Sequence, residues 1–154
     1  MEVEQISLFL ENKSGGVADV VDLLSRNHIE VRALSLADMA DFGILRLIVP
    51  ETERARRVLH DGGFTVRATQ VVAVEIPGRE GGLAEVLNAL KRQAINVEYM
   101  YAYVERSGEH AIIIFRFNAT DRAIENLTKS YAAQASIWKR GAAPPGDEGY
   151  EEGG

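Results

Sequence analysis

The chain opens with a short stretch in which apolar and polar residues alternate, and this pattern then changes to a helical one. Residues 4–10 alternate in the way that a half-buried strand requires. Residues 16–27 instead repeat apolar side chains at the spacing of one helix face. The two patterns continue, with strands expected at 30–38, 44–49 and 64–70 and a helix expected at 51–60. The predicted order is therefore strand, helix, strand, strand, helix, strand.

The same order recurs in the second part of the chain, where the expected elements lie at 71–76, 81–93, 96–105, 110–117, 119–129 and 131–138. Residues 15–31 and 81–97 are identical at 8 of 17 positions, among them a glycine pair at the start of each helix. We interpret this as an internal duplication. It places one repeat at 1–70, a second at 71–140, and an acidic Gly- and Pro-rich tail at 141–154 that we expect to be disordered. Two βαββαβ repeats predict an α+β, ferredoxin-like fold with the helices on one face of an antiparallel sheet.

Composition narrows the classes of function. The chain has 17 Lys and Arg against 23 Asp and Glu, a formal net charge of −6, so it presents no basic field to attract nucleic acid. It has no cysteine, which excludes disulfides and thiolate metal sites and fits the cytoplasm, where we expect the protein. No apolar run reaches the length of a membrane span. His28, His60 and His110 do not share metal-site spacing with carboxylates, so no metal or other cofactor is predicted.

The paired glycines are the clearest chemical signal. Gly15 and Gly16 lie between the first predicted strand and helix, and Gly81 and Gly82 occupy the same place in the second repeat. Glycine lets the backbone approach a ligand closely. The first N–H groups of a helix have no intrahelical partner and favour an anion. Each turn is therefore a candidate site for a carboxylate.

The residues of these turns resemble those of ACT domains. Asn12-Lys13-Ser14-Gly15 is similar to the first turn of ACT repeats, with Ser in place of Pro, and Gly78-Arg79-Glu80-Gly81 is similar to it at fewer positions. Residues 10–15, 40–46 and 98–102 look like stretches of stand-alone tandem ACT-domain proteins of bacteria. The resemblance covers about residues 3–139.

The resemblance implies a regulatory protein that binds a small molecule, typically an amino acid, and that is not an enzyme. It also implies that the two repeats pair side by side through their second strands, which would give one eight-stranded antiparallel sheet with four helices on one face. A ligand would then sit between the glycine turn of one repeat and the second strand of the other. The regulated enzyme is not encoded in this chain.

Two unequal ligand sites follow from that arrangement. The first would be formed by Asn12, Lys13, Ser14, Gly15, Gly16, Val17, Tyr99, Met100 and Tyr101. The second, expected to be weaker because Gly78 replaces the Asn side chain, would be formed by Gly78, Arg79, Glu80, Gly81, Gly82, Leu83, Leu34, Ser35 and Leu36. The ammonium group of an amino acid needs acceptors, and the candidate carboxylates are Asp38, Asp41 and Glu98.

A row of tyrosines marks the sheet face that carries no helices. Tyr99, Tyr101 and Tyr103 alternate along one predicted strand, beside Ile112 and Ile114 of the next. An apolar and aromatic face of this size rarely stays exposed in a monomer. We therefore expect a homodimer in which two chains stack through this face, with a ring-lined pocket as the alternative.

Two other functions are compatible with the same chain order. An acylphosphatase-type enzyme would need an arginine and an asparagine in a phosphate cradle, and the first turn has Asn12 but no arginine. An RNA-binding module would stack bases on aromatic side chains of the open sheet face. The negative net charge and the lack of a basic-aromatic signature at 111–117 argue against RNA.

Overall fold

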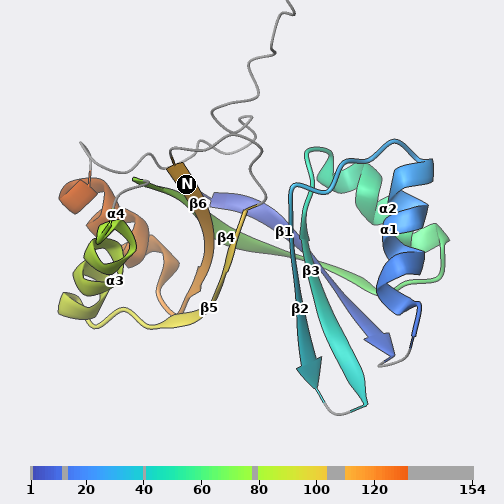
Figure 1. Cartoon of the computed structure of the whole chain (residues 1–154), viewed down its shortest axis with the longest axis horizontal. Helices are drawn as coiled ribbons and strands as arrows, with labels where there is room; N and C mark the ends of the chain where they lie inside the picture. Colours follow the sequence, from blue (N-terminus) through green and yellow to red (C-terminus); the bar gives the residue numbers. More distant parts are fainter. Residues whose placement is uncertain (1, 12–13, 40, 78–79, 104–109, 132–154) are drawn as a thin grey trace, which may run out of the picture.

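In the computed structural model, the described residues form a six-stranded antiparallel sheet and four helices (Figure 1). The structure describes residues 2–11, 14–39, 41–77, 80–103 and 110–131. The elements in chain order are β1 (Glu2–Glu11), α1 (Gly16–Arg26), β2 (Ala33–Met39), β3 (Phe42–Ile48), α2 (Thr52–Asp61), β4 (Val66–Pro77), α3 (Gly82–Arg92), β5 (Val97–Ala102), β6 (His110–Phe117) and α4 (Thr120–Tyr131). None of the helices in these ranges is long and apolar enough to span a membrane.

The helices lie within two residues of the ranges that the periodicity predicts. α1 buries Val20 and Leu24, and α3 buries their counterparts Val86 and Leu90. These apolar faces account for the helices, because a helix of this length is stabilised mainly by packing. The two repeats therefore share the way in which their first helices pack, as well as their sequence pattern.

β4 joins two strands that the sequence predicts separately, at 64–70 and 71–76. Its first part pairs with β1, from Val66 to Val72, and its second part pairs with β6, from Val72 to Pro77. The residues from Val66 to Ile76 include no glycine or proline that would end a strand. The strand order is consequently β2-β3-β1-β4-β6-β5, with β4 shared between an N-terminal half (β1, α1, β2, β3 and α2) and a C-terminal half (α3, β5, β6 and α4).

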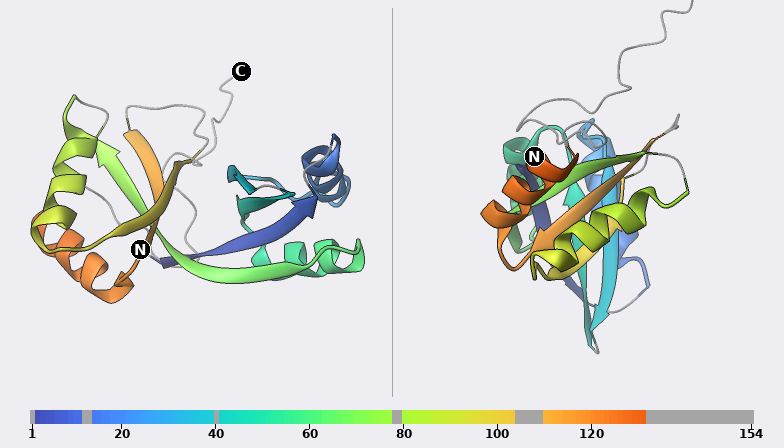
Figure 2. Two further views of the ribbon diagram at one scale, coloured as in Figure 1. Left: turned by 90° about the horizontal axis from the view of Figure 1, so that it is seen from below. Right: turned by 90° about the vertical axis from the view of Figure 1, so that its left-hand side faces the viewer.

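All four helices cover the same face of this sheet, as predicted. Val66 of β4 packs against the core beneath α1 and α2, whereas Val72, Val74 and Ile76 belong to the core beneath α3 and α4. These residues are an even number of positions apart, so their side chains point to one side of the strand. The helix pairs lie at the two outer ends of the molecule, and the sheet curves between them (Figures 1 and 2).

Within the part of the chain that the structure describes, the second strands β2 and β5 do not pair with each other. Among the described residues the sheet has six strands, and β2 and β5 are its edges, which approach one another without pairing. The curvature instead brings the helix-free face of one half against that of the other. A third apolar cluster fills this contact and consists of Ala33, Ile48, Val71, Ala73, Ile112 and Ile114. The strand expected at 131–138 lies, from residue 132 onward, outside the described residues, as does the tail at 141–154.

The row of tyrosines lies in the same contact. Gln5 of β1 is fully buried; its Nε2 donates a hydrogen bond of 2.8 Å to Tyr99, and its Oε1 accepts one of 2.6 Å from Tyr101. The guanidinium of Arg46 lies 3.8 Å from the centre of the Tyr99 ring. Burial raises the pKa of Tyr101, and the nearby Tyr99 adds to the rise.

The residues expected to form a homodimer interface thus contact the N-terminal half of the same chain. Tyr101 and Tyr103 pack on the cluster that contains Ile112 and Ile114, and the other side of that cluster comes from the N-terminal half. Within one chain this contact buries Ile112 and Ile114 and half-buries the three tyrosines. The physical reason is the continuous strand β4, which lets the sheet curl until its two helix-free faces bury each other.

Candidate functional site

The first turn of α1 lies at the end of β1, beyond a glycine in the left-handed conformation. Gly15, the residue before α1, has φ 91°, and Gly81 before α3 has φ 86°. Neither helix start has a hydrogen bond from a capping side chain. Gly15 itself has no side chain that could cap the first N–H groups of α1, and a carboxylate ligand would bind such groups where they lack a partner.

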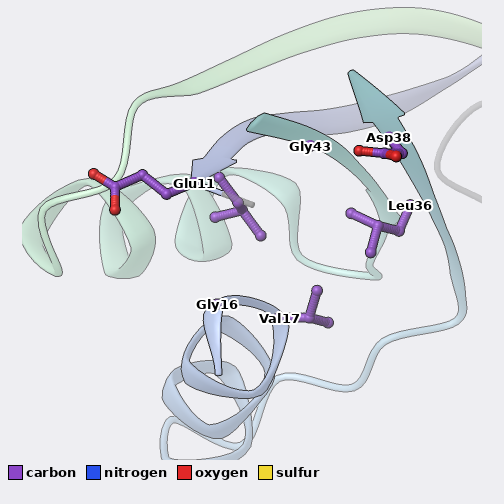
Figure 3. A pocket seen from close by; sticks show the side chains of 7 residues that line it. Glu11, Gly16, Val17, Leu36, Asp38 and Gly43 are labelled. Carbon is purple, nitrogen blue, oxygen red and sulfur yellow. The ribbon is translucent and has the colours of Figure 1, made fainter. Parts of the chain in front are cut away.

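A cavity of about 90 Å³ opens beside this turn (Figure 3). Residues from four elements surround it: Leu10, Glu11, Gly16, Val17, Leu36, Asp38 and Gly43. β1 contributes the first two, α1 the next two, β2 the following two, and β3 the last. The cavity therefore lies between the start of α1 and the β2–β3 hairpin of the same half.

The strand register explains why these residues meet. Gly43 of β3 pairs with Asp38 on one side and with Leu10 on the other. These three positions therefore lie side by side across the sheet, under the first turn of α1. Figure 3 shows Val17 on the helix side of the cavity and Leu36 and Asp38 on the β2 side. The Glu11 side chain extends away from Asp38.

The chemistry of the lining has two distinct parts. Leu10, Val17 and Leu36 supply apolar walls, whereas Asp38 supplies a carboxylate at the edge of the cavity. The backbone of Gly16 at the start of α1 lies opposite. A group with separated negative and positive charges fits this distribution, because helix N–H groups favour an anion and a carboxylate favours a cation.

Gly43 leaves space that any other residue would fill. A Cβ atom added there would lie 3.1 Å from Cδ1 of Leu36 and 3.4 Å from the carbonyl oxygen of Ala37. At Gly16, an added Cβ would lie 3.5 Å from the carbonyl oxygen of Glu11, an ordinary contact. The hairpin side of the cavity is therefore the tighter one.

The residues predicted for the first site are brought together only in part. Gly16 and Val17 line the cavity, and Ser14 and Gly15 are exposed in the preceding turn. Asn12 and Lys13 lie outside the described residues. Met100 is 37% exposed on β5, and Tyr99 and Tyr101 do not reach this turn.

The position of the two tyrosines follows from their partner on β1. Both bond to Gln5, six residues before Glu11, which is about 20 Å along a strand at about 3.3 Å per residue. They also lie on the helix-free face of the sheet, opposite α1. The glycine turn consequently meets the second strand of its own half instead of that of the other half. The tyrosines on which the RNA-binding alternative depends are half-buried in the contact between the two halves.

The residues predicted for the second site are separated in the same way. Leu36 lines the cavity of the N-terminal half, Leu34 is 41% exposed on β2, and Ser35 is half-buried on the other face of that strand. Glu80, Gly81, Gly82 and Leu83 form the start of α3. Gly78 and Arg79 fall outside the described residues.

The C-terminal half offers a direct comparison with the cavity. Ala111 pairs with Ile76, as Gly43 pairs with Leu10, and Ala102 pairs with Ile113, as Leu36 pairs with Leu45. Alanines therefore stand where the N-terminal half has Leu36 and Gly43. The counterpart of Asp38 in the sequence is Val104, which lies outside the described residues. At the sequence position that corresponds to Asp38, the second half therefore has a neutral side chain.

Of the three candidate ammonium partners, the structure places one at the cavity. Asp38 lines it, whereas Asp41 is exposed in the turn after β2 and Glu98 is exposed on β5. Sequence reasoning missed Leu10, Glu11 and Gly43. Hairpin pairing of the strands predicted at 30–38 and 44–49 across the short connection between them would place Gly43 beside Asp38. Among the described residues, no group of three or more His, Asp or Glu side chains could hold a metal ion.

Comparison with known proteins agrees with this architecture. Residues 1–134 match the family described as ACT domain pair. The crystal structure of protein BT0572 from Bacteroides thetaiotaomicron is 36% identical with a TM-score of 0.80, over 89% of this chain and 93% of that one. No curated protein matches the sequence.

Two more distant structures share the fold. The ligand-free regulatory subunit of aspartate kinase from Thermus thermophilus is 15% identical with a TM-score of 0.60, over 83% of this chain and 92% of that one. The corresponding subunit from Thermus flavus is 16% identical with a TM-score of 0.55, over the same shares of the two chains.

Proposed function

Because the chain belongs to the ACT domain pair family, we propose that it is a non-catalytic regulatory protein that binds a free amino acid in the cavity of its N-terminal half. The observation that carries this proposal is the position of Asp38 across the cavity from the first turn of α1. The N–H groups at the start of α1 could bind the carboxylate of a zwitterion, and the carboxylate of Asp38 could bind its ammonium group.

In this proposal the ligand carboxylate binds the N–H groups at the start of α1, near Gly16 and Val17. These groups have no intrahelical partners, and the helix dipole favours negative charge at this end. The ligand ammonium lies on the β2 side, where Asp38 attracts it. The ligand side chain then lies against the apolar walls formed by Leu10, Val17 and Leu36.

The proposal assigns one principal site to each chain instead of two. The C-terminal half keeps the glycine turn, but the sequence has Val104 in place of Asp38, and Ala111 in place of Gly43. A neutral side chain at position 104 offers an ammonium group no charged partner. A zwitterion would therefore bind the C-terminal half much more weakly.

A regulatory role is supported by the family and by the kind of protein that shares the fold. The two Thermus proteins are regulatory subunits of aspartate kinase. We propose that this chain likewise acts on a separate protein. A ligand regulates only if it binds one arrangement better than another. The two halves share β4 and a buried contact, so the ligand would act on how they pack.

The test is calorimetric titration of the full chain with each of the twenty amino acids, together with a thermal-shift screen. A ligand selective for the folded state raises the melting temperature, by an amount that grows with ligand concentration above Kd. We expect Asp38→Asn to weaken binding of the best ligand at least tenfold. Asp41→Asn is the matched control, because it removes the same charge from an exposed position three residues away and should leave Kd within twofold.

Two results would contradict the proposal. Absence of binding by every amino acid at millimolar concentration would remove the ligand class. Equal effects of the Asp38 and Asp41 substitutions would show that the cavity is not the site, since the pair differ in position and not in charge.

A further inference from the structure

We infer that Leu36 and Gly43 together limit the size of the ligand side chain, so that the protein selects small amino acids over large aliphatic and aromatic ones. This inference rests on the proposed function, because it concerns the same cavity. The class of ligand is small amino acids, and Leu36 and Gly43 are the two residues that determine this selectivity.

The available space is the first argument. The cavity measures about 90 Å³ and is smaller than an engineered cavity of about 150 Å³ that binds benzene. Part of the space must accept the carboxylate and the α-carbon of the ligand. The remainder suits a side chain of a few atoms better than an aromatic ring.

The contact between Leu36 and Gly43 is the second argument. A single Cβ atom at position 43 would come within 3.1 Å of Cδ1 of Leu36, closer than nearly all contacts of real Cβ atoms. A side chain at position 43 would therefore require Leu36 to shift by a few tenths of an ångström. Leu36 is also 56% exposed, so it stands at the mouth of the cavity and is not locked into the core.

The duplication supplies the third argument, because it contains the same two positions with different residues. The C-terminal half has Ala102 and Ala111 in equivalent register. One position carries alanine where the N-terminal half has leucine, and the other carries the Cβ that would meet a leucine there. The two positions therefore differ between the halves in the way that a shared space requires.

The experiment titrates the full chain with glycine, alanine, serine, valine, leucine and phenylalanine by calorimetry. For the unmodified protein we expect the tightest binding among the first three and at least tenfold weaker binding of leucine and phenylalanine. Binding of phenylalanine as tight as that of alanine would overturn the inference and leave the proposed function intact. If no amino acid binds, the proposed function and the inference about ligand size are both contradicted.

Three variants test the two named residues. Leu36→Ala should improve binding of valine or leucine at least fivefold relative to alanine. Gly43→Ala should weaken binding of every ligand at least fivefold. The double variant should recover at least half of that loss, because it reproduces the alanine pair of the C-terminal half. Folding of each is checked by circular dichroism and by its melting temperature.

Ala102→Leu is the matched control, since it adds the same leucine at the equivalent position of the other half. It should leave the order of amino-acid affinities unchanged. An unchanged order in Leu36→Ala, or equal changes in Leu36→Ala and Ala102→Leu, would overturn the inference.

Discussion

The hydroxyl of Tyr101 donates a 2.6 Å hydrogen bond to Oε1 of Gln5, a residue 96 positions earlier in the chain. Gln5 is fully buried, and its Nε2 donates to Tyr99 at 2.8 Å and to Ser7 Oγ at 3.3 Å. One amide side chain thus connects the helix-free faces of both halves. Because these groups are removed from water, an unmade bond among them costs more than it would at the surface.

Tyr101→Phe should destabilise the folded chain by about 1–3 kcal/mol, because it leaves Gln5 Oε1 buried without its donor. Tyr99→Phe should reduce the free energy of unfolding by less than Tyr101→Phe does, since Nε2 of Gln5 retains Ser7 Oγ as an acceptor. Urea unfolding followed by circular dichroism measures both. Light scattering should show the same mass for all three proteins. A change of mass on Tyr101→Phe without a loss of stability would instead place this tyrosine between two chains.

Stability should fall at alkaline pH, because burial raises the pKa of Tyr101 in the folded state. The unfolded chain releases this proton near pH 10, the ordinary tyrosine value. The folded chain holds the proton to higher pH. The contribution of the protonated Tyr101 hydroxyl to the free energy of unfolding is therefore fully present below about pH 10. It is lost as the pH rises above that value. Urea unfolding at a series of pH values measures this loss.

The Tyr101→Phe variant is the control for that dependence. It lacks the titrating group, so its stability should fall less steeply above about pH 10. In the folded state, tyrosinate absorbance should also show that the variant has one fewer tyrosine with a raised pKa than the unmodified protein. Identical curves for the two proteins would contradict the burial of this hydroxyl.

Gly15→Ala and Gly16→Ala should separate folding from binding at the first turn. Gly15 has φ 91° with open space around it, so alanine there is strained by the backbone alone and should cost about 1–2 kcal/mol. Gly16 is not in the left-handed region, and its added Cβ would make an ordinary contact. Gly16→Ala should therefore keep the melting temperature within a few degrees while narrowing the cavity and weakening ligand binding.

Thermal unfolding and calorimetric titration of these two variants provide the measurement. For Gly15→Ala we expect a lower melting temperature with little change in Kd at pH 7. For Gly16→Ala we expect a higher Kd with little change in melting temperature. The same loss of stability in both would mean that the left-handed conformation of Gly15 is not the cause.

The parts of the fold that depend on neighbouring residues were predictable. The bounds of α1 and α3 follow from the glycine before each helix and from the apolar spacing within it, both of which are local. The pairing of β2 with β3 follows from a short turn. The strands predicted at 64–70 and 71–76 are continuous in β4, because both carry β-forming residues, and only their different partners, β1 and β6, distinguish them.

The candidate site was predictable on the α1 side only. The glycine turn indicated Gly16 and Val17, and the search for an ammonium partner included Asp38. The expected opposite wall came from Tyr99 to Tyr101, whereas the structure supplies Leu36, Asp38 and Gly43. The choice between these walls depends on how the two halves pack, and alternation within a strand does not contain that information.

The sequence by itself determined the duplication, the order of helices and strands, and the glycine turns, because each rests on contacts or conformations within a few residues. Only the tertiary structure decided that the sheet curls so that its helix-free faces bury each other around Gln5, with the cavity inside one half. That choice depends on the free energy of burying two distant apolar faces together. The faces come from strands far apart in the chain, so their partnership appears only when the whole chain is folded.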